Sequence, residues 1–258
     1  MKRLLSNLLR PLGAATLATV ATLALTTSVL AQPTYKVGST PTGIPFTFMD
    51  TKTQQIQGAM VDLITAIGES QGFKVTVEAT PFSALVPSLT SNKIDIISAA
   101  MLITPARLEV IDFSDPVFPY PEGLMVKADD NKTYKSLADL KGEVVGVQVG
   151  TVYVDFLKKN GEFAEIKTYD SIADIIRDVG LGRIKGGFSD APIIRYQLSQ
   201  RKDAGVKFVE SYEPKMAGFV GLGTRKGDKE LQAKLNAGLA KVKQSGQLDE
   251  ILKKWNLK

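Results

Sequence analysis

The spacing of apolar residues switches repeatedly between two periods along this chain. Apolar residues in the segment 58–67 fall on one face of a helix, whereas residues 73–79 alternate as a strand does. The order strand, helix, strand, helix, strand occurs twice. The predicted elements are residues 35–38, 58–67, 73–79, 84–89 and 94–98 in the first repeat, and residues 144–149, 152–159, 165–169, 172–179 and 184–188 in the second.

Each repeat predicts an open, mostly parallel α/β sheet with helices on both faces. Two such lobes facing each other create one cleft, because ligands of open α/β sheets bind outside the carboxyl ends of the strands. Residues 117–123 and 213–218 contain Pro and Gly and are predicted to be the two crossover strands of a hinge. We therefore expect lobe 1 to contain residues 32–118 and 219–258, and lobe 2 to contain residues 119–218.

The C-terminal part of the chain is predicted to be helical. Leu231, Leu235 and Leu239 repeat at helical spacing, and residues 248–255 form a further amphipathic stretch. We expect Trp255 at its end to pack against the protein rather than to contact a ligand. The same is expected of Phe46 and Phe48.

The first 31 residues have the pattern of a secretory signal. Lys2, Arg3 and Arg10 are basic, and residues 12–30 carry no charge. Residues 29–31 provide small side chains before a cleavage point. An uncleaved membrane anchor is the alternative, since the apolar run approaches the length that spans a bilayer. Cleavage would leave 227 residues, which suits two lobes of about 100 residues each.

The composition excludes several classes of function. The chain has no cysteine and no histidine. Disulfides, a lipid-modified cysteine and a Ser-His-Asp or Cys-His nucleophile are therefore excluded, and a transition-metal site lacks its commonest ligands. Without the three basic residues of the signal, the net charge falls from +5 to +2, which indicates no nucleic-acid partner. We expect no metal and no cofactor.

Arg107 stands where local physical chemistry disfavours a cation. Thr104 and Pro105 are a good N-cap and first-turn pair, so a helix should begin there after the buried strand. A cation in the first turn opposes the helix dipole, at a cost of about 0.3–1 kcal/mol. An anionic ligand would remove this conflict. Alternatively, Arg107 extends into solvent or pairs with Glu109 or Asp112.

Two further positions follow strands of the second repeat. Gly150 and Thr151 lie between a strand and a helix, where unpaired N–H groups can bind a carboxylate, or where they form an ordinary turn. Asp190 precedes Ala191 and Pro192 and can act as the N-cap of the next helix. Both positions lie at strand ends that would face the predicted cleft.

Motifs along nearly the whole predicted mature chain resemble the bacterial extracellular solute-binding proteins of family 3, the polar amino-acid receptors of ABC importers. The resemblance implies a two-lobed periplasmic binding protein fold of the type II kind, a periplasmic location and a monomer that works with an inner-membrane permease. The motifs are Tyr35-Lys36-Val37-Gly38, Lys93-Ile94-Asp95-Ile96-Ile97, Ile103-Thr104-Pro105-Ala106-Arg107, Ile111-Asp112-Phe113-Ser114-Asp115-Pro116, Val145-Gly146-Val147-Gln148-Val149-Gly150-Thr151 and Gly246-Gln247-Leu248-Asp249.

The resemblance also implies roles for individual residues. Arg107 would hold the α-carboxylate of a free amino acid through a bidentate pair. Asp190 would bind the ammonium group together with the carbonyl of Ala100. Phe82 would form a wall of the side-chain pocket. The other positions expected to contact the ligand are Thr40, Leu102, Gln148, Gly150, Thr151 and Val152, where Val152 replaces a common hydroxyl.

Other departures from the family concern the ligand side chain. Leu102 replaces a hydroxyl that commonly faces the ammonium, and Thr40 and Gly43 stand where many relatives have an acidic residue and an aromatic lid. No carboxylate is left to pair with a basic ligand and no second arginine with an acidic one, so we expect an uncharged side chain. Gln148 and Tyr153 are candidate contacts to it, although Tyr153 can equally be solvated surface.

Two alternatives to a transport receptor remain open. Prephenate and arogenate (cyclohexadienyl) dehydratases resemble this fold, and such an enzyme would need an acid or base near Arg107, for which Glu122 is the obvious hinge-side carboxylate. A sensory receptor could use the same fold. We expect a binding protein and not an enzyme. Its affinity should be nearly flat between about pH 5.5 and 8, because Arg107 and Asp190 normally keep their charges there.

Overall fold

The structure is a computed structural model that describes residues 32–201 and 203–258. The predicted secretory signal, residues 1–31, lies outside the described residues. Residues Gln32–Lys258 form one compact unit. Among the helices that the structure describes, none is both long and apolar enough to cross a membrane.

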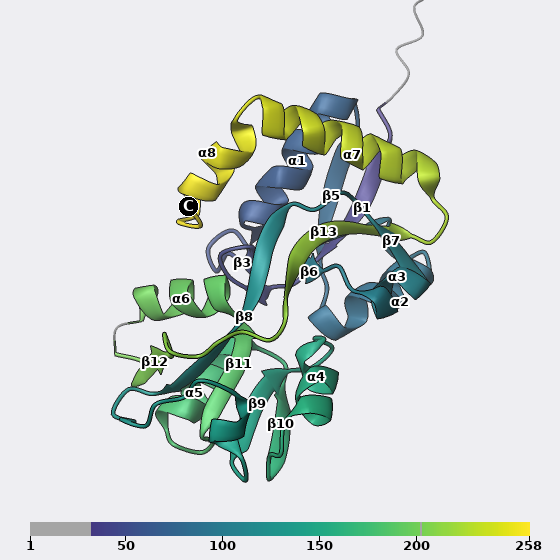
Figure 1. The fold of residues 1–258 in the computed structure, drawn as a ribbon. Coiled ribbons are helices and arrows are strands. Elements are labelled where there is room, and N and C mark those ends of the chain that lie inside the picture. The colour runs from purple at the N-terminus through teal and green to yellow at the C-terminus, as the bar shows by residue number, and fades with distance from the viewer. Residues whose placement is uncertain (1–31, 202) are drawn as a thin grey trace, which may run out of the picture. The chain divides into compact units, whose positions relative to one another are not determined.

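A continuous sheet of ten strands runs through this unit (Figure 1). Each end of the sheet has three parallel strands followed by an antiparallel one, in the order β5-β1-β6-β13 for lobe 1 and β10-β9-β11-β8 for lobe 2. The predicted α/β repeat is therefore confirmed. The strands are β1 (Thr34–Ser39), β5 (Lys74–Ala79), β6 (Ile96–Leu102), β8 (Phe118–Lys127), β9 (Val144–Gln148), β10 (Glu165–Tyr169), β11 (Gly186–Asp190) and β13 (Ala217–Arg225).

The long strands β8 and β13 join the two lobes. They pair antiparallel from Phe118 opposite Val220 to Pro121 opposite Ala217. Beyond these pairs, β8 continues along β11 in lobe 2 and β13 continues along β6 in lobe 1 (Figure 1). Both predicted crossover segments thus contribute to a strand, although residues 213–216 precede the start of β13. The lobe boundaries given above stay a prediction.

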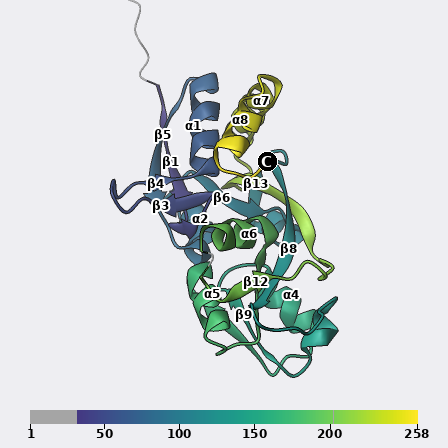
Figure 2. The same ribbon diagram turned by 90° about the vertical axis from the view of Figure 1, so that its left-hand side faces the viewer.

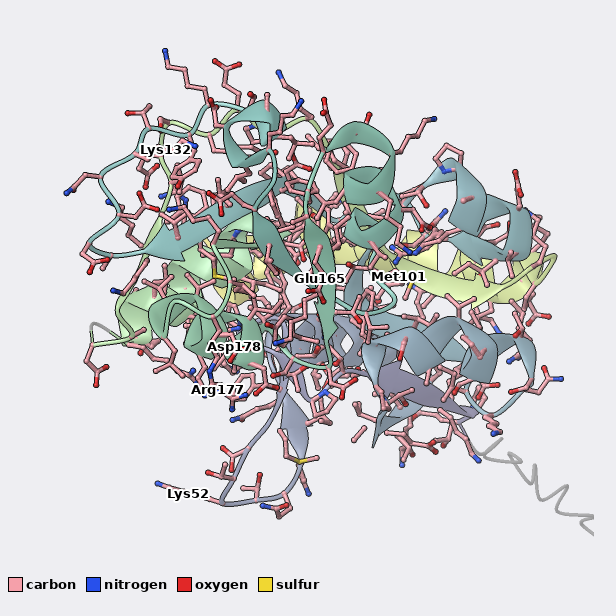
Figure 3. The ribbon with its side chains drawn as sticks, turned by 90° about the horizontal axis from the view of Figure 1, so that it is seen from below. Lys52, Met101, Lys132, Glu165, Arg177 and Asp178 are labelled. Carbon is pink, nitrogen blue, oxygen red and sulfur yellow. The ribbon has the colours of Figure 1, made fainter. Side chains whose placement is uncertain are left out.

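Short strands complete the fold. Two of them extend the main sheet, where β7 pairs with β13 and β12 pairs with β8, and three form a separate small sheet. The loop between β3 and β4 projects outward with Lys52 at its tip (Figure 3). These strands are β2 (Thr42–Gly43), β3 (Thr47–Met49), β4 (Ile56–Gln57), β7 (Ile111–Phe113) and β12 (Val206–Phe208).

Amphipathic helices cover the sheet. In lobe 1, α1 packs against α7 and α8, and Figures 1 and 2 both show α7 alongside α1. Leu231, Leu235 and Leu239 of α7 are buried as predicted. The helices are α1 (Ala59–Gln71), α2 (Leu85–Thr90), α3 (Pro105–Val110), α4 (Tyr153–Asn160), α5 (Ile172–Gly180), α6 (Ala191–Gln200), α7 (Lys229–Gln244) and α8 (Gln247–Lys254), with the 3-10 helices η1 (Phe82–Ala84) and η2 (Leu137–Leu140).

Trp255 packs within lobe 1, as the sequence predicts. Its ring meets Phe48 edge to face at 5.5 Å between centroids, and its indole N–H donates to Asp62 at 2.7 Å. Phe46 is buried in the core. These three aromatic residues therefore serve packing.

The third parallel strand of each lobe begins later than predicted. The predicted strand at residues 94–98 is β6 at Ile96–Leu102, and the one at residues 184–188 is β11 at Gly186–Asp190. In lobe 1 the chain first turns at Asn92, which has a φ of 60°. Strand β6 then continues to Leu102, which pairs with Val220 of β13, and all seven residues of the strand are buried. The shift carries Leu102 and Asp190 to the ends of the two strands, directly beside α3 and α6.

Candidate functional site

Arg107 lies in α3 just after the end of β6. Thr104 caps this helix as predicted, accepting a hydrogen bond from the Arg107 backbone N–H at 3.4 Å. One guanidinium nitrogen donates to the carbonyl of Leu102 at 2.9 Å, and the guanidinium carbon lies 5.7 Å from the centre of the Phe82 ring. The side chain therefore turns back toward the end of its own strand instead of extending into solvent.

The predicted alternative that Arg107 pairs with Asp112 is wrong. The Asp112 carboxylate is held by Lys226 at 3.0 Å and Lys229 at 2.9 Å. Glu109 takes part in none of the ion pairs among the described residues. Burial lowers the pKa of Arg107 to about 10, against the opposing effect of the Asp190 charge. Arg107 is thus a partly desolvated cation, and the anion that acts on it most, Asp190, belongs to the other lobe.

The second guanidinium nitrogen of Arg107 reaches across to lobe 2. It donates to the carbonyl of Gly150 at 3.3 Å. Gly150 lies in the turn between β9 and α4, and its φ is 77°. The two lobes therefore meet at this turn.

Asp190 ends β11 and occupies the N-cap position of α6, but its side chain makes no capping hydrogen bond. It instead accepts a hydrogen bond from the hydroxyl of Tyr153 at 2.5 Å. Asp190 therefore occupies the predicted N-cap position, but its carboxylate does not cap the helix. Burial raises the pKa of Asp190 to about 7, although the hydrogen bond from Tyr153 and the charge of Arg107 both lower it. The premise that Asp190 stays charged down to about pH 5.5 is thus wrong.

For Tyr153 the sequence left two alternatives, a solvated surface position and a contact to the ligand side chain. The surface alternative is wrong. The residue is buried, with 2% of its surface exposed. Burial and the neighbouring Asp190 raise its pKa well above the ordinary value, so the phenol stays protonated and can donate. Tyr153 is therefore the partner that orients Asp190, a role that no local pattern in the sequence indicates.

In the turn after β9, the predicted alternative of an ordinary turn holds for Thr151. The Thr151 N–H donates to the Gln148 carbonyl at 3.3 Å and its hydroxyl donates to the same carbonyl at 2.7 Å, so this N–H is not unpaired. The amide of Gln148 donates to the carbonyl of Asp170 at 3.0 Å. Val152 occupies the N-cap position of α4. The side-chain amide of Gln148 therefore bonds within lobe 2.

The remaining candidates of lobe 1 lie around the end of β6. Ala100 has a φ of 49°, an uncommon value for a residue with a side chain, and the ladder between β6 and β13 shifts register nearby. Thr40 is buried with its hydroxyl 3.3 Å from that of Thr42. Leu102 is a core residue that contributes its carbonyl, not its side chain, to Arg107.

Glu122 is a buried carboxyl group of β8, one of the two strands that join the lobes. It has no exposed surface, and one carboxylate oxygen accepts hydrogen bonds from the Tyr212 hydroxyl at 2.6 Å and the Lys215 N–H at 2.8 Å. Burial raises the pKa of Glu122. The carboxyl group thus fastens the second crossover segment to β8, at the position opposite Asp190 in the ladder between β8 and β11.

Chemically, the site offers one cation and one anion from different lobes. The planar guanidinium of Arg107 can donate two hydrogen bonds to a carboxylate, and Asp190 can accept hydrogen bonds from an ammonium group. A cavity of about 850 Å³ lies elsewhere, beside β5 and α1, and none of the candidate residues lines it. The candidate residues are therefore at the junction of the lobes and not in that cavity.

Comparison with known proteins gives matches over most of the chain. Residues 35–258 match the model of the bacterial extracellular solute-binding proteins, family 3. The ABC transporter arginine-binding protein 1 of Escherichia coli (strain K12) is 30% identical over 202 residues, which cover 78% of this chain and 82% of that protein.

Solved structures are also similar over most of the chain. An ancestral arginine-binding protein, 34% identical, is known bound to arginine with a TM-score of 0.79 and bound to glutamine with a TM-score of 0.81, and each match covers 88% of this chain and 99% of the other. The ancestral amino acid-binding protein AncCDT-1, a precursor of cyclohexadienyl dehydratase, is 32% identical with a TM-score of 0.77, covering 86% of this chain and 94% of its own.

Proposed function

Because the chain belongs to the bacterial extracellular solute-binding proteins of family 3, we propose that it binds a free amino acid for an ABC importer. Arg107 takes the α-carboxylate and Asp190 takes the α-ammonium. The observation that carries this proposal is that these two opposite charges come from different lobes and act on each other. A free amino acid carries both complementary charges on one carbon atom, so it can join the lobes.

Neighbouring groups complete the proposed site. The carbonyl of Ala100 accepts a second hydrogen bond from the ammonium, and the ring of Phe82 forms one wall of the side-chain pocket. Gly150, Thr151 and Val152 approach the ligand carboxylate from lobe 2. Support comes from two contacts of the Arg107 guanidinium, with the ring of Phe82 and with the carbonyl of Gly150. Thr40 and Leu102 border the site from lobe 1.

The ligand side chain is proposed to be uncharged. Asp190 is assigned to the ammonium, and Glu122 is buried in hydrogen bonds to the hinge. Asp190 is then not available to a basic side chain, Glu122 has no exposed surface through which one could reach it, and an unpaired ionic group is costly to bury. The relatives leave room for this choice, because the ancestral arginine-binding protein is also known with glutamine bound.

A screen of all common amino acids tests the proposal. A ligand present at 1,000 times its Kd should stabilise the protein by about 4 kcal/mol, which a thermal-shift assay detects. Calorimetric competition then ranks the ligands. We expect a neutral amino acid to bind most tightly. Tight binding of arginine, lysine or glutamate with neutral ones excluded would refute the side-chain assignment, and a screen without any amino-acid ligand would refute the function itself.

We propose further that the protein acts as a periplasmic monomer with an inner-membrane permease. The family and the secretory pattern of residues 1–31 support this. Fractionation of cells and light scattering of the purified protein are the tests. A sensory role would instead be indicated by a signalling protein that binds the liganded form while no permease does.

The similarity to AncCDT-1, described as a precursor of cyclohexadienyl dehydratase, is the observation that favours the dehydratase alternative. Glu122 has no exposed surface and one of its oxygens accepts two hydrogen bonds, which argues against its acting on a substrate. Incubation with prephenate should therefore give no product above the uncatalysed rate. Sustained turnover would establish the enzyme instead.

A further inference from the structure

We infer that Gly150 makes the carboxylate-binding geometry of Arg107 depend on closure of the lobes. This inference rests on the proposed function and concerns the same site. Gly150 does two things at once: its carbonyl accepts a hydrogen bond from Arg107, and its backbone lies directly against η1 of lobe 1. Both contacts join lobe 2 to lobe 1.

The approach of Gly150 to lobe 1 leaves no room for a side chain. A Cβ at this position would lie 2.6 Å from the Cα of Ser83, 2.8 Å from its Cβ and 3.1 Å from its backbone nitrogen. Two of these three atoms belong to the backbone of the 3-10 helix η1, so rotation of a side chain cannot relieve the contact. Any residue other than glycine would therefore force the two turns apart.

The same turn fixes the guanidinium of Arg107. Its two terminal nitrogens donate to one carbonyl in each lobe, Leu102 in lobe 1 and Gly150 in lobe 2. Opening the lobes removes the second of these bonds, and the guanidinium then keeps only its bond to Leu102. A planar group held at two points presents its remaining N–H donors in a fixed direction, whereas one held at a single point does not.

Gly150 is thus a positioning residue that acts on the ligand through Arg107. In the open form, lobe 1 alone would bind a carboxylate weakly through a mobile Arg107. In the closed form, the Gly150 carbonyl fixes Arg107 and the approach to Ser83 allows the lobes to meet. Affinity for the α-carboxylate therefore rises with closure. Lobe 2 contributes to this affinity through Gly150, although Arg107 of lobe 1 binds the carboxylate.

Substitution of Gly150 by alanine tests this, and the chain offers a matched control. Gly142 has a φ of 75°, close to the 77° of Gly150, and a Cβ built on Gly142 meets nothing within 4 Å. Gly142→Ala and Gly150→Ala therefore introduce the same backbone strain in the same lobe, and only the second introduces a steric conflict. Any difference between the two variants reports the contact with Ser83.

We expect calorimetry to show affinity reduced by about 10- to 100-fold in Gly150→Ala, the effect of one added methyl group in a tight contact. Gly142→Ala should bind within about threefold of the wild type. Small-angle scattering should show ligand-induced compaction in the wild type and Gly142→Ala but not in Gly150→Ala. Ser83→Val adds bulk to the same contact from the exposed side of lobe 1 without backbone strain, so it reads the contact even if Gly150→Ala folds poorly.

The outcomes separate this inference from the proposed function. If the wild type binds an amino acid while Gly150→Ala and Ser83→Val bind and compact as it does, the inference is overturned and the function stands. If the folded wild type binds no amino acid, the function fails and the inference fails with it.

Discussion

The two lobes repeat one scaffold but end it in opposite charges. In lobe 1 the third parallel strand ends at Leu102 and is followed by Arg107, and in lobe 2 the third parallel strand ends at Asp190. The two groups are also fixed differently. Backbone carbonyls of both lobes hold the arginine, whereas a single buried hydroxyl from its own lobe holds the aspartate.

This difference teaches how a repeated fold becomes a receptor for a dipolar ligand. Carbonyl acceptors suit a cation, and they cannot lose their acceptor capacity with pH. A carboxylate held by one phenol inside a desolvated site can be protonated. Lobe 1 should therefore supply a constant charge, and lobe 2 should supply a charge that depends on conditions.

Removing the constant charge should have the largest effect. Arg107→Ala should reduce the affinity for any α-amino acid by about 3–5 kcal/mol, because the ligand carboxylate would then be buried without a partner. Arg107→Lys should restore only part of the loss, since an ammonium cannot form the bidentate pair. Calorimetry on variants shown by circular dichroism to be folded measures both. Affinity of the alanine variant within threefold of the wild type would place the carboxylate elsewhere.

Acidification should weaken binding by acting on lobe 2. Asp190 must be ionised to bind an ammonium group, and its pKa in the unliganded protein is raised to about 7. Below that pH, binding has to release a proton, so affinity should fall by about 10- to 25-fold between pH 7.5 and 5.5. Arg107 keeps its charge throughout, since its pKa is about 10. Titrations across this range should show the decline in the wild type and a flat profile in Asp190→Asn; a flat wild-type profile would contradict the assignment.

The hydroxyl of Tyr153 should tune the same charge. Tyr153→Phe removes the hydrogen bond that lowers the pKa of Asp190, so affinity should drop by about tenfold at pH 7 and the pH profile should move to higher pH. Tyr134→Phe is the matched control, because Tyr134 is buried in lobe 2 and donates to Asp130 at 2.8 Å. It should change stability but not affinity. Equal effects of the two variants on binding would show that Tyr153 acts only in folding.

Neutralising Glu122 should have the smallest effect on binding. Glu122→Gln keeps an acceptor for Tyr212 and Lys215, and affinity should stay within about threefold of the wild type. Calorimetry at pH 7 is the measurement. A larger loss would bring this carboxyl group into the ligand site and would revive the enzyme alternative.

The regular elements were predictable because their signals are local. Alternation in residues 73–79 and the amphipathic pattern of α1 depend on neighbours within one element. Strands β6 and β11 both begin two residues later than predicted, and they end four residues later in β6 and two in β11, because the end of a buried strand is set by the strands beside it. The family motifs identified Arg107 and Asp190 as candidates, but not what holds them.

The supports of the site could not be predicted because they join distant segments. Tyr153 and Asp190 are 37 residues apart, and Glu122 and Tyr212 are 90 apart. Periodicity says nothing about such pairs. The sequence could not show whether the Thr151 N–H is unpaired, for another reason. The turn is tight enough for this N–H to bond to the Gln148 carbonyl. Predicting that bond requires the turn conformation.

The central claim is that each lobe binds one end of the same ligand, and calorimetry with trimmed ligands tests it most directly. The amino acid that binds best is compared with its amine, which lacks the carboxylate, and its acid, which lacks the ammonium, in the wild type, Arg107→Ala and Asp190→Asn. Arg107→Ala should lose the preference for the amino acid over its amine and keep the preference over its acid, and Asp190→Asn should do the reverse. If both variants lose both preferences equally, or neither variant loses any, the assignment of one charge to each lobe is contradicted.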